Sequence, residues 1–228
     1  MIELARQEFE KDTGSPRFIV VEGPIGAGKT SLAQRLAESF SAELVLEQVA
    51  LNPFLEQFYK SPKTAALPAQ LFFLFQRARL LEELRQSDLF APVRVADFHI
   101  AKDRLFAELT LSRDELDLYN QIYSKLDIDA PQPDLVIYLQ ASVDTLMTRI
   151  AQRGNPHERR IDRSYMERLA DAYARYYHGY DETPLLIVNV SGIDPAREEG
   201  DYAALFEQVN RITGGRHFFN PAATVAFA

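Results

Sequence analysis

Short apolar runs alternate with amphipathic segments along this chain, which is the pattern of strands alternating with helices. Five runs of mostly apolar residues are strand-length and near-continuous, at 18–21, 43–47, 93–97, 135–139 and 185–189. Longer segments with helical spacing lie between them, at 29–40, 64–86, 143–152 and 165–180. Continuous apolar strands are buried on both faces, so the pattern predicts a five-stranded parallel sheet in a three-layer α/β/α fold.

The organisation along the chain is that of one domain. Its 228 residues, of which 46% are hydrophobic, suit one large core better than two. We expect an N-terminal extension at 1–16, the domain at 17–213 and a C-terminal tail without a clear element at 214–228.

The segment that follows the first strand fits the phosphate-binding pattern G-x-x-x-x-G-K-[ST]. It comprises Gly23, Pro24, Ile25, Gly26, Ala27, Gly28, Lys29 and Thr30. In such a loop backbone N–H groups surround phosphate oxygens, the lysine adds positive charge, and the hydroxyl can ligate Mg²⁺. A chance match is improbable because a strand precedes the loop and a helix follows it. The sequence therefore predicts binding of a nucleoside triphosphate.

Composition narrows the classes of partner. With 25 basic and 33 acidic side chains the net charge is −8, which disfavours a nucleic acid polymer as ligand. The absence of cysteine excludes disulfides and thiolate chemistry. The N-terminal segment lacks the apolar core of a signal peptide, and no apolar run approaches membrane-spanning length. These features predict a soluble, cytoplasmic protein that does not bind membranes.

Two carboxylates end predicted strands beside the phosphate loop. Parallel strands place their carboxyl ends at the ligand-binding edge of the sheet, and Glu47 and Asp97 fall there. Transfer of a phosphoryl group to a hydroxyl needs a base, and Mg²⁺ needs an acidic anchor besides Thr30. Glu47 and Asp97 are candidates for these roles. The alternative for either residue alone is a helix cap or a solvated loop.

A basic segment follows the fourth strand. Arg149 and Arg153 are one helical turn apart, so they are expected to share a face and to meet a transferring phosphoryl group together. The segment would act as an arginine-rich lid over bound ATP. The alternative is a solvated helix end rich in charge.

These residues resemble the deoxyribonucleoside kinase family, over roughly 18–209. The matching motifs are the phosphate loop preceded by Glu22, the strand-ending Glu47 and the turn Tyr59-Lys60-Ser61-Pro62. A helical glutamine with an arginine seven residues later, Gln70 and Arg77, and an Asp-Arg pair beginning at Asp103 follow. The resemblance implies that Glu47 deprotonates the sugar 5′-hydroxyl and that Tyr59 and Glu158 bind the 3′-hydroxyl. It also implies that Gln70, Arg77 and Asp103 read the base. Without the family match, Gln70 would be interpreted as a core amide.

Two departures from the family pattern concern positive charge. The family has an arginine after the strand-ending acid of its third motif, whereas this chain has Phe98. Lys102, Arg104 or a lid arginine would then have to compensate. In the lid the family has a third arginine where this chain has Asn155.

The resulting hypothesis is transfer of the ATP γ-phosphoryl group to the 5′-hydroxyl of a deoxyribonucleoside. Thr30 and Asp97 would place Mg²⁺, and Arg149 and Arg153 would stabilise developing charge. Resemblance to bacterial deoxyadenosine and deoxyguanosine kinases favours a purine, and it also implies a homodimer. One alternative is a thymidylate-type nucleoside monophosphate kinase, for which Arg77 and Arg104 are candidates to bind the acceptor's phosphate. Another is a nucleotide-dependent switch protein, which the loss of the third-motif arginine favours.

Overall fold

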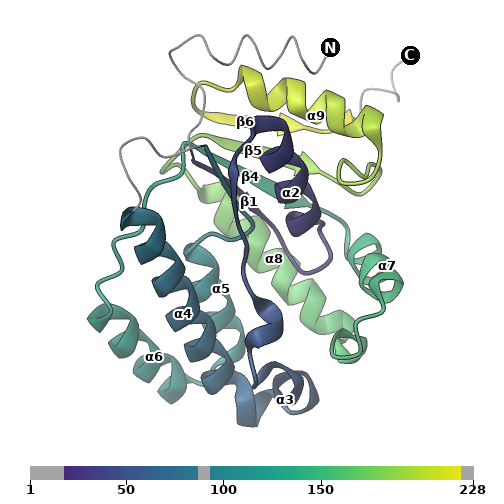
Figure 1. Cartoon of the computed structure of the whole chain (residues 1–228). Coiled ribbons are helices and arrows are strands. Elements are labelled where there is room, and N and C mark those ends of the chain that lie inside the picture. The colour runs from purple at the N-terminus through teal and green to yellow at the C-terminus, as the bar shows by residue number, and fades with distance from the viewer. Residues whose placement is uncertain (1–17, 87–92, 222–228) are drawn as a thin grey trace.

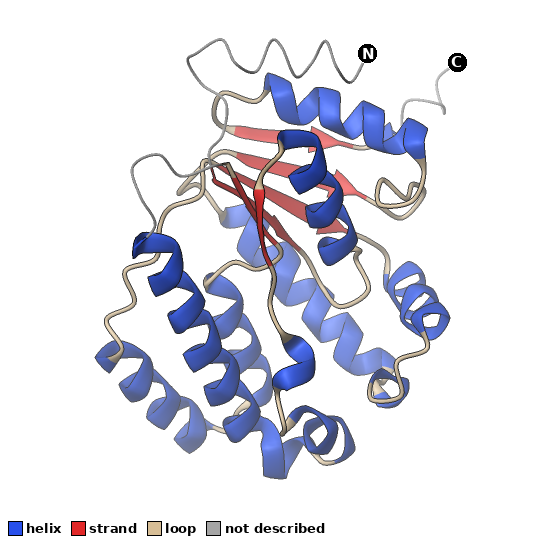
Figure 2. Ribbon diagram, in the orientation of Figure 1, coloured by secondary structure: helices blue, strands red, loops and turns tan. Residues whose placement is uncertain are grey.

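The computed structural model describes residues 18–86 and 93–221, and the predicted extension at 1–16 lies outside them. A sheet of parallel strands crosses this part of the chain, with the order β2-β3-β1-β4-β5-β6. The strands are β1 (Phe18–Glu22), β2 (Glu43–Val45), β3 (Arg94–Ala96), β4 (Leu135–Gln140), β5 (Leu185–Asn189) and β6 (Arg216–Phe219). Figures 1 and 2 show the twisted sheet between helices. The predicted α/β/α fold with a parallel sheet is confirmed.

The prediction of five strands is one strand short, because β6 lies in the segment expected to be a tail without an element. β6 pairs in parallel with β5, from Leu185 opposite Arg216 to Val188 opposite Phe219. It lies at the edge of the sheet, and its first three residues are exposed. An edge strand that exposes both faces lacks the continuous apolar run by which the other strands were predicted.

Helices cover both faces of the sheet, as Figures 1 and 2 show. The helices of the described residues are α2 (Lys29–Phe40), α3 (Leu55–Lys60), α4 (Pro62–Gln86), α5 (Ala101–Thr110), α6 (Arg113–Lys125), α7 (Val143–Arg153), α8 (Arg163–Gly179) and α9 (Glu199–Arg211). α2 and α9 pack together on one face, where the rings of Phe40 and Phe206 are 5.1 Å apart. α4, α5 and α8 cover the other face, and α6 packs outside α4 and α5. Single-turn 3₁₀ helices lie at Val49–Leu51 and Glu158–Arg160.

Local sequence sets the ends of the helices that border the site. α7 begins after Ser142, whose side chain accepts a hydrogen bond from the Thr145 N–H, and it is followed by Gly154, whose φ of 70° ends the helix. α8 begins after Asp162, which accepts from the Tyr165 N–H. These caps fix where the segment between α7 and α8 leaves one helix and enters the next.

The core behind the phosphate loop contains a stack of buried tyrosines. The Tyr138 ring of β4 lies 4.7 Å from that of Tyr177 on α8, and Tyr173 stacks beside both. The hydroxyl of Tyr173 donates a hydrogen bond to Glu22 at the end of β1, over 3.0 Å. The core thus directly holds the residue that precedes the loop.

Candidate active site

The phosphate loop joins β1 to α2 in the predicted place. Lys29 is the first residue of α2, and its ammonium donates to the carbonyl oxygens of Gly23 and Pro24 over 2.7 and 3.1 Å. Gly26 has φ 87°, and a Cβ there would lie 2.8 Å from the Leu146 carbonyl oxygen of α7. Only glycine fits this turn and this close approach to α7. Burial, and then the positive charge of Lys102, lower the pKa of Lys29 to about 8.

Thr30 and Asp97 meet across the top of the sheet. The Thr30 hydroxyl donates to Asp97 Oδ2 over 2.5 Å, and the Glu47 N–H donates to Asp97 Oδ1 over 2.8 Å. Hydroxyl and carboxylate oxygens are ligands that suit Mg²⁺, which is commonly held by one or two carboxylates together with substrate phosphates. Within residues 18–86 and 93–221 no group of three or more His, Cys, Asp or Glu side chains is arranged to hold a metal ion. The pair therefore fits a cation that takes its remaining ligands from phosphate and water.

The Glu47 carboxylate lies between two buried cations. Arg77 of α4 forms an ion pair with its Oε1, and Lys102 of α5 donates to its Oε2 over 2.9 Å. The Glu47 side chain is only 6% exposed. Burial raises the pKa of Glu47, but Arg77 and Lys102 together outweigh it and hold the pKa at about 2. The carboxylate is therefore ionised and fixed in direction at neutral pH.

Arg77 joins this carboxylate to Asp103, one of the predicted base-reading residues. The Arg77 guanidinium bonds Asp103 Oδ1, while Asp103 Oδ2 is buried and has no hydrogen-bond partner among the described residues. Burial raises the pKa of Asp103 to about 6, although Arg77 pulls it down. Gln70 lies seven residues before Arg77 on α4, and its amide donates to the Thr110 hydroxyl over 3.3 Å. The structure thus brings Arg77 and Asp103 together and places Gln70 two turns away along the helix.

Tyr59 and Glu158 come together from α3 and the 3₁₀ helix after α7. Burial, and then the negative charge of Glu158, raise the pKa of Tyr59 well above its usual range. Arg153 Nε donates to Glu158 Oε2 over 3.0 Å. The predicted pair of 3′-hydroxyl ligands is therefore assembled at one place, next to a lid arginine.

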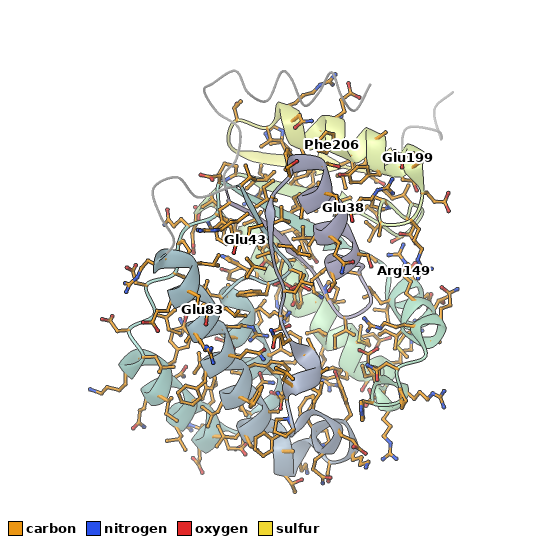
Figure 3. The ribbon with its side chains drawn as sticks, in the orientation of Figure 1. Glu38, Glu43, Glu83, Arg149, Glu199 and Phe206 are labelled. Carbon is orange, nitrogen blue, oxygen red and sulfur yellow. The ribbon has the colours of Figure 1, made fainter. Side chains whose placement is uncertain are left out.

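The two predicted lid arginines have different partners. Arg149, labelled on α7 in Figure 3, donates to the Val190 and Ile193 carbonyl oxygens over 2.9 Å and to that of Ala27 in the loop over 3.4 Å. Arg153 is half exposed and bonds Glu158. Arg149 thus lies against the phosphate loop, whereas Arg153 is directed to the pair formed by Tyr59 and Glu158.

Two buried charged residues of the site, Glu22 and Lys102, were noted in the sequence but were not assigned a definite role there. Glu22 accepts hydrogen bonds from the N–H groups of Gly23 and His99 and from the Tyr173 hydroxyl. Lys102 Nζ lies 4.0 Å from Glu22 Oε1, besides its bond to Glu47. A glutamate that ends a buried apolar strand is a signal for such a role. Lys102 was considered from the sequence only as one of several cations that would compensate for the arginine missing at position 98, because its helix was not predicted and its inward direction could not be known.

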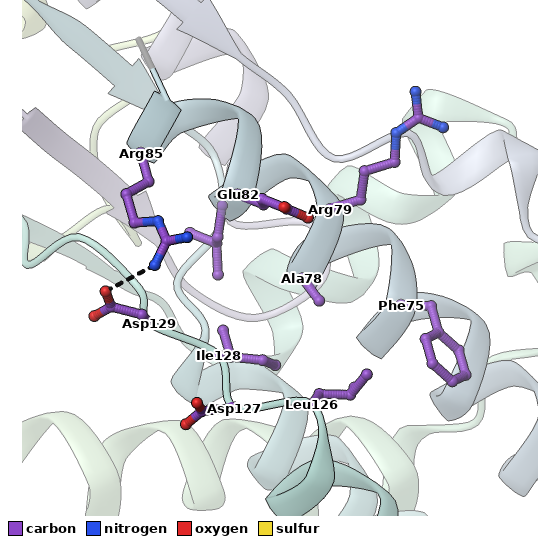
Figure 4. Close-up of a pocket in the computed structure, with 10 residues that line it drawn as sticks. Phe75, Ala78, Arg79, Glu82, Arg85, Leu126, Asp127, Ile128 and Asp129 are labelled. Carbon is purple, nitrogen blue, oxygen red and sulfur yellow. Dashed lines mark hydrogen bonds and ion pairs between the residues drawn. The ribbon is translucent and has the colours of Figure 1, made fainter. Parts of the chain in front are cut away.

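A separate hollow of about 510 Å³ lies on the outer side of α4 (Figure 4). The C-terminal half of α4 and the loop after α6 line it, and Arg85 pairs with Asp129 across it over 3.0 Å. It contains none of the predicted site residues, so it is separate from the phosphate loop.

Comparison with known proteins agrees with this arrangement. The sequence pattern of the family described as "Deoxynucleoside kinase" matches residues 19–213. The chain belongs to the deoxynucleoside kinase family. It is 44% identical over 160 residues to a deoxyguanosine kinase of Bacillus subtilis, covering 68% of this chain and 76% of that one. It is 30% identical over 193 residues to a deoxyadenosine kinase of Lactobacillus acidophilus, covering 78% and 87%.

Solved structures show the same fold. A deoxyadenosine kinase from M. mycoides with bound dCTP superposes with a TM-score of 0.72 at 24% identity, covering 86% of this chain and all of that one. From the family match, the relatives and the fold, the protein is an ATP-dependent kinase of the deoxynucleoside kinase family on a P-loop fold, as the motifs predicted.

None of the helices described here is both long and apolar enough to span a membrane.

Proposed function

We propose that this kinase transfers the γ-phosphoryl group of ATP to the 5′-hydroxyl of a purine deoxyribonucleoside. One observation carries the proposal: a buried, ionised carboxylate, Glu47, is bonded through its own backbone to the residue that meets the phosphate loop. Asp97 accepts hydrogen bonds from the Thr30 hydroxyl and from the Glu47 N–H, so it ties the backbone of Glu47 to the phosphate site. In-line transfer to a hydroxyl depends on such fixed positions of the base and the phosphate site.

The chain's own residues divide the work of transfer. Lys29 and the loop N–H groups bind the ATP phosphates. Glu47 takes the proton of the 5′-hydroxyl as that oxygen attacks the γ-phosphorus. Arg149, against the loop, and Arg153, in the lid, contribute positive charge as the lid closes.

Mg²⁺ belongs to this proposal, with Thr30 and Asp97 as the residues that would hold it. When bound, the ion supplies positive charge to the phosphate oxygens. The adjacent hydroxyl and carboxylate support this role, because both offer the oxygen ligands that Mg²⁺ prefers.

Tyr59 and Glu158 are proposed to bind the 3′-hydroxyl, and Gln70, Arg77 and Asp103 to read the base. The unpartnered Oδ2 of Asp103 is an acceptor that suits an N–H of the base, and a buried acceptor without a partner is costly unless a ligand satisfies it. Guanine and adenine both offer amino groups. The relatives described above, a deoxyguanosine and a deoxyadenosine kinase, support a purine.

The nucleoside monophosphate kinase alternative would use Arg77 and Arg104 to bind the acceptor's phosphate. Arg77 is already paired with two carboxylates. Arg104 is exposed and lies 5.9 Å from the ring centre of Tyr123, on the outside of α5. Neither guanidinium is available at the site, which argues for a nucleoside acceptor.

Quaternary structure and location complete the proposal. We infer a homodimer, supported by the exposed apolar side chains of Phe75 on α4 and Leu118 on α6, two helices that pack side by side. The cytoplasmic location, and the division into an extension at 1–16, a domain at 17–213 and a tail at 214–228, stay predictions.

The test is ATP-dependent phosphorylation of the four deoxynucleosides. The ribonucleosides and dTMP are assayed separately as alternative acceptors. We expect product from deoxyguanosine or deoxyadenosine and none from dTMP. Transfer to dTMP alone would support the monophosphate kinase, and ATP hydrolysis without any acceptor product would support a switch protein.

A further inference from the structure

Phe98 leaves the position after Asp97 without a positive charge. Its side chain is 2% exposed and belongs to the main hydrophobic core. A charged group there would be buried among apolar side chains. The positive charge expected beside the reacting oxygens must therefore come from another residue.

Three arginines that could supply this charge, one close to Phe98 in sequence and two in the lid, have other partners. Arg104 is on the outside of α5, over the Tyr123 ring. Arg149 bonds backbone carbonyl oxygens of the loop and of the segment after β5. Arg153 bonds Glu158. Among the described residues, the ion-pair partners of the Glu47 carboxylate are Arg77 and Lys102, and none of these three arginines is one of them.

Lys102 lies where the missing charge is needed. It is on the first turn of α5, four residues after Phe98, and it is 5% exposed. Its Nζ is 2.9 Å from Glu47 Oε2 and 4.0 Å from Glu22 Oε1, the residue that precedes the phosphate loop. An ammonium between the base and the loop adjoins the path along which a phosphoryl group passes from ATP to a hydroxyl.

Charges around Lys102 support this position. Burial lowers its pKa, but Glu22 and Glu47 outweigh burial and raise the pKa above its ordinary value. Lys102 in turn lowers the pKa of Lys29 and helps to lower that of Glu47. Its charge therefore acts on the phosphate loop, through Lys29, and on the proposed base, Glu47. An ammonium has three N–H donors, and the bond to Glu47 uses one of them.

We propose that Lys102 is a catalytic residue that contacts the transferring phosphoryl group and replaces the charge that Phe98 lacks. This inference rests on the proposed function. In the step, the bond between the γ-phosphorus and the β-γ bridging oxygen breaks, and its electron pair leaves with ADP. A bond forms between the γ-phosphorus and the 5′-oxygen, and the 5′-proton goes to Glu47. Lys102 remains protonated and stabilises the negative charge on the phosphoryl oxygens.

The experiment compares Lys102→Met and Lys102→Arg with the matched control Arg104→Met. Arg104 is a cation on the same helix, but it faces outward. Assays use the full chain with ATP, Mg²⁺ and whichever deoxynucleoside the wild type phosphorylates. ATP and nucleoside affinities of each variant are measured by calorimetry at a temperature where circular dichroism shows it to be folded.

Removal of one hydrogen-bond donor that stabilises charge developing in the transition state lowers kcat by about 100- to 1,000-fold. We expect Lys102→Met to show such a loss with KM values unchanged, because the contact acts in the transition state. Lys102→Arg should recover at least about tenfold of this loss, since it restores the charge. Arg104→Met should match the wild type.

A second comparison separates direct contact from an effect through Glu47. In the background of Glu47→Gln, we expect Lys102→Met to lower single-turnover transfer by a further tenfold or so. No further loss would overturn the proposal, because Lys102 would then act only by holding Glu47. Wild-type kcat in Lys102→Met would overturn it as well. Absence of transfer by the wild-type protein would instead refute the proposed function.

Discussion

Replacing Glu47 by Gln tests the proposed base and the buried charges around it. Gln keeps the size of the side chain but cannot take the proton of a hydroxyl at neutral pH. A positioned base contributes about 10²- to 10⁴-fold, so we expect kcat to fall by about this factor. Lys29 and Thr30 form their hydrogen bonds with the loop and with Asp97. ATP affinity should therefore stay close to that of the wild type.

The same change has a cost in stability that follows from the site. Burial raises the pKa of Glu47, but Arg77 and Lys102 hold it at about 2, against an ordinary value of 4.5. At about 1.4 kcal/mol for each pKa unit, the ionised carboxylate contributes about 3 kcal/mol to the free energy of unfolding. Because this pKa is lowered on folding, the contribution is present above pH 4.5 and lost as the pH falls towards 2. Losing it lowers Tm by about 6–12 °C in a chain of this size.

The assay pairs this variant with Glu43→Gln, at the start of β2, the strand that Glu47 follows by two residues. Glu43, labelled in Figure 3, is 51% exposed and pairs with Arg94 over 3.0 Å, so its loss should change stability by at most about 0.5 kcal/mol. ADP release is followed at 20 °C or so, where a domain with a lowered Tm stays folded, and unfolding is followed by calorimetry. Undiminished turnover in Glu47→Gln would refute the assignment of the base. Unchanged stability would refute the charge balance derived above.

Three further substitutions test other parts of the site. Burial raises the pKa of Asp103 to about 6, so the wild type should lose about 3 kcal/mol of stability relative to Asp103→Asn as the pH rises from 3.8 through 6. If urea unfolding gives the same difference in stability between wild type and variant at pH 4 and at pH 7, this prediction is wrong. Tyr59→Phe should raise KM about tenfold for a deoxynucleoside but not for its 2′,3′-dideoxy analogue; an equal rise for both would exclude a contact with the 3′-hydroxyl. Gly26→Ala should abolish ATP binding in calorimetry, since its Cβ would lie 2.8 Å from the Leu146 carbonyl oxygen, whereas Gly179→Ala, with no neighbour within 4 Å, should bind ATP normally.

Much of the fold was predictable because its central strands are buried on both faces. The runs that became β1, β4 and β5 are almost entirely apolar, and their burial matches that pattern. β6 was missed because its first three residues are exposed and only its last residue is partly buried. α5 and α6 were missed for a related reason. They pack against other helices, so charged residues interrupt their apolar stripes, and Asp103 and Lys102 are buried despite their charge.

The residues of the site can likewise be separated into those that the sequence predicts and those that it does not. The loop, Glu47 and Asp97 were predictable because each follows within two residues of the end of a predicted strand, and a parallel sheet brings such positions to one edge. The partners of Glu47 were not, since Arg77 and Lys102 reach it from helices 30 and 55 residues further along the chain. The loss of an arginine at position 98 was visible in the sequence, yet only the direction of α5 distinguishes Lys102, turned inward, from its neighbour Arg104, turned outward. Side-chain direction on a helix changes by about 100° for each residue, so two cations two positions apart lie on nearly opposite faces. A motif can therefore lose a charged residue and regain the charge one turn later, and the sequence shows the replacement only once the phase of that helix is known.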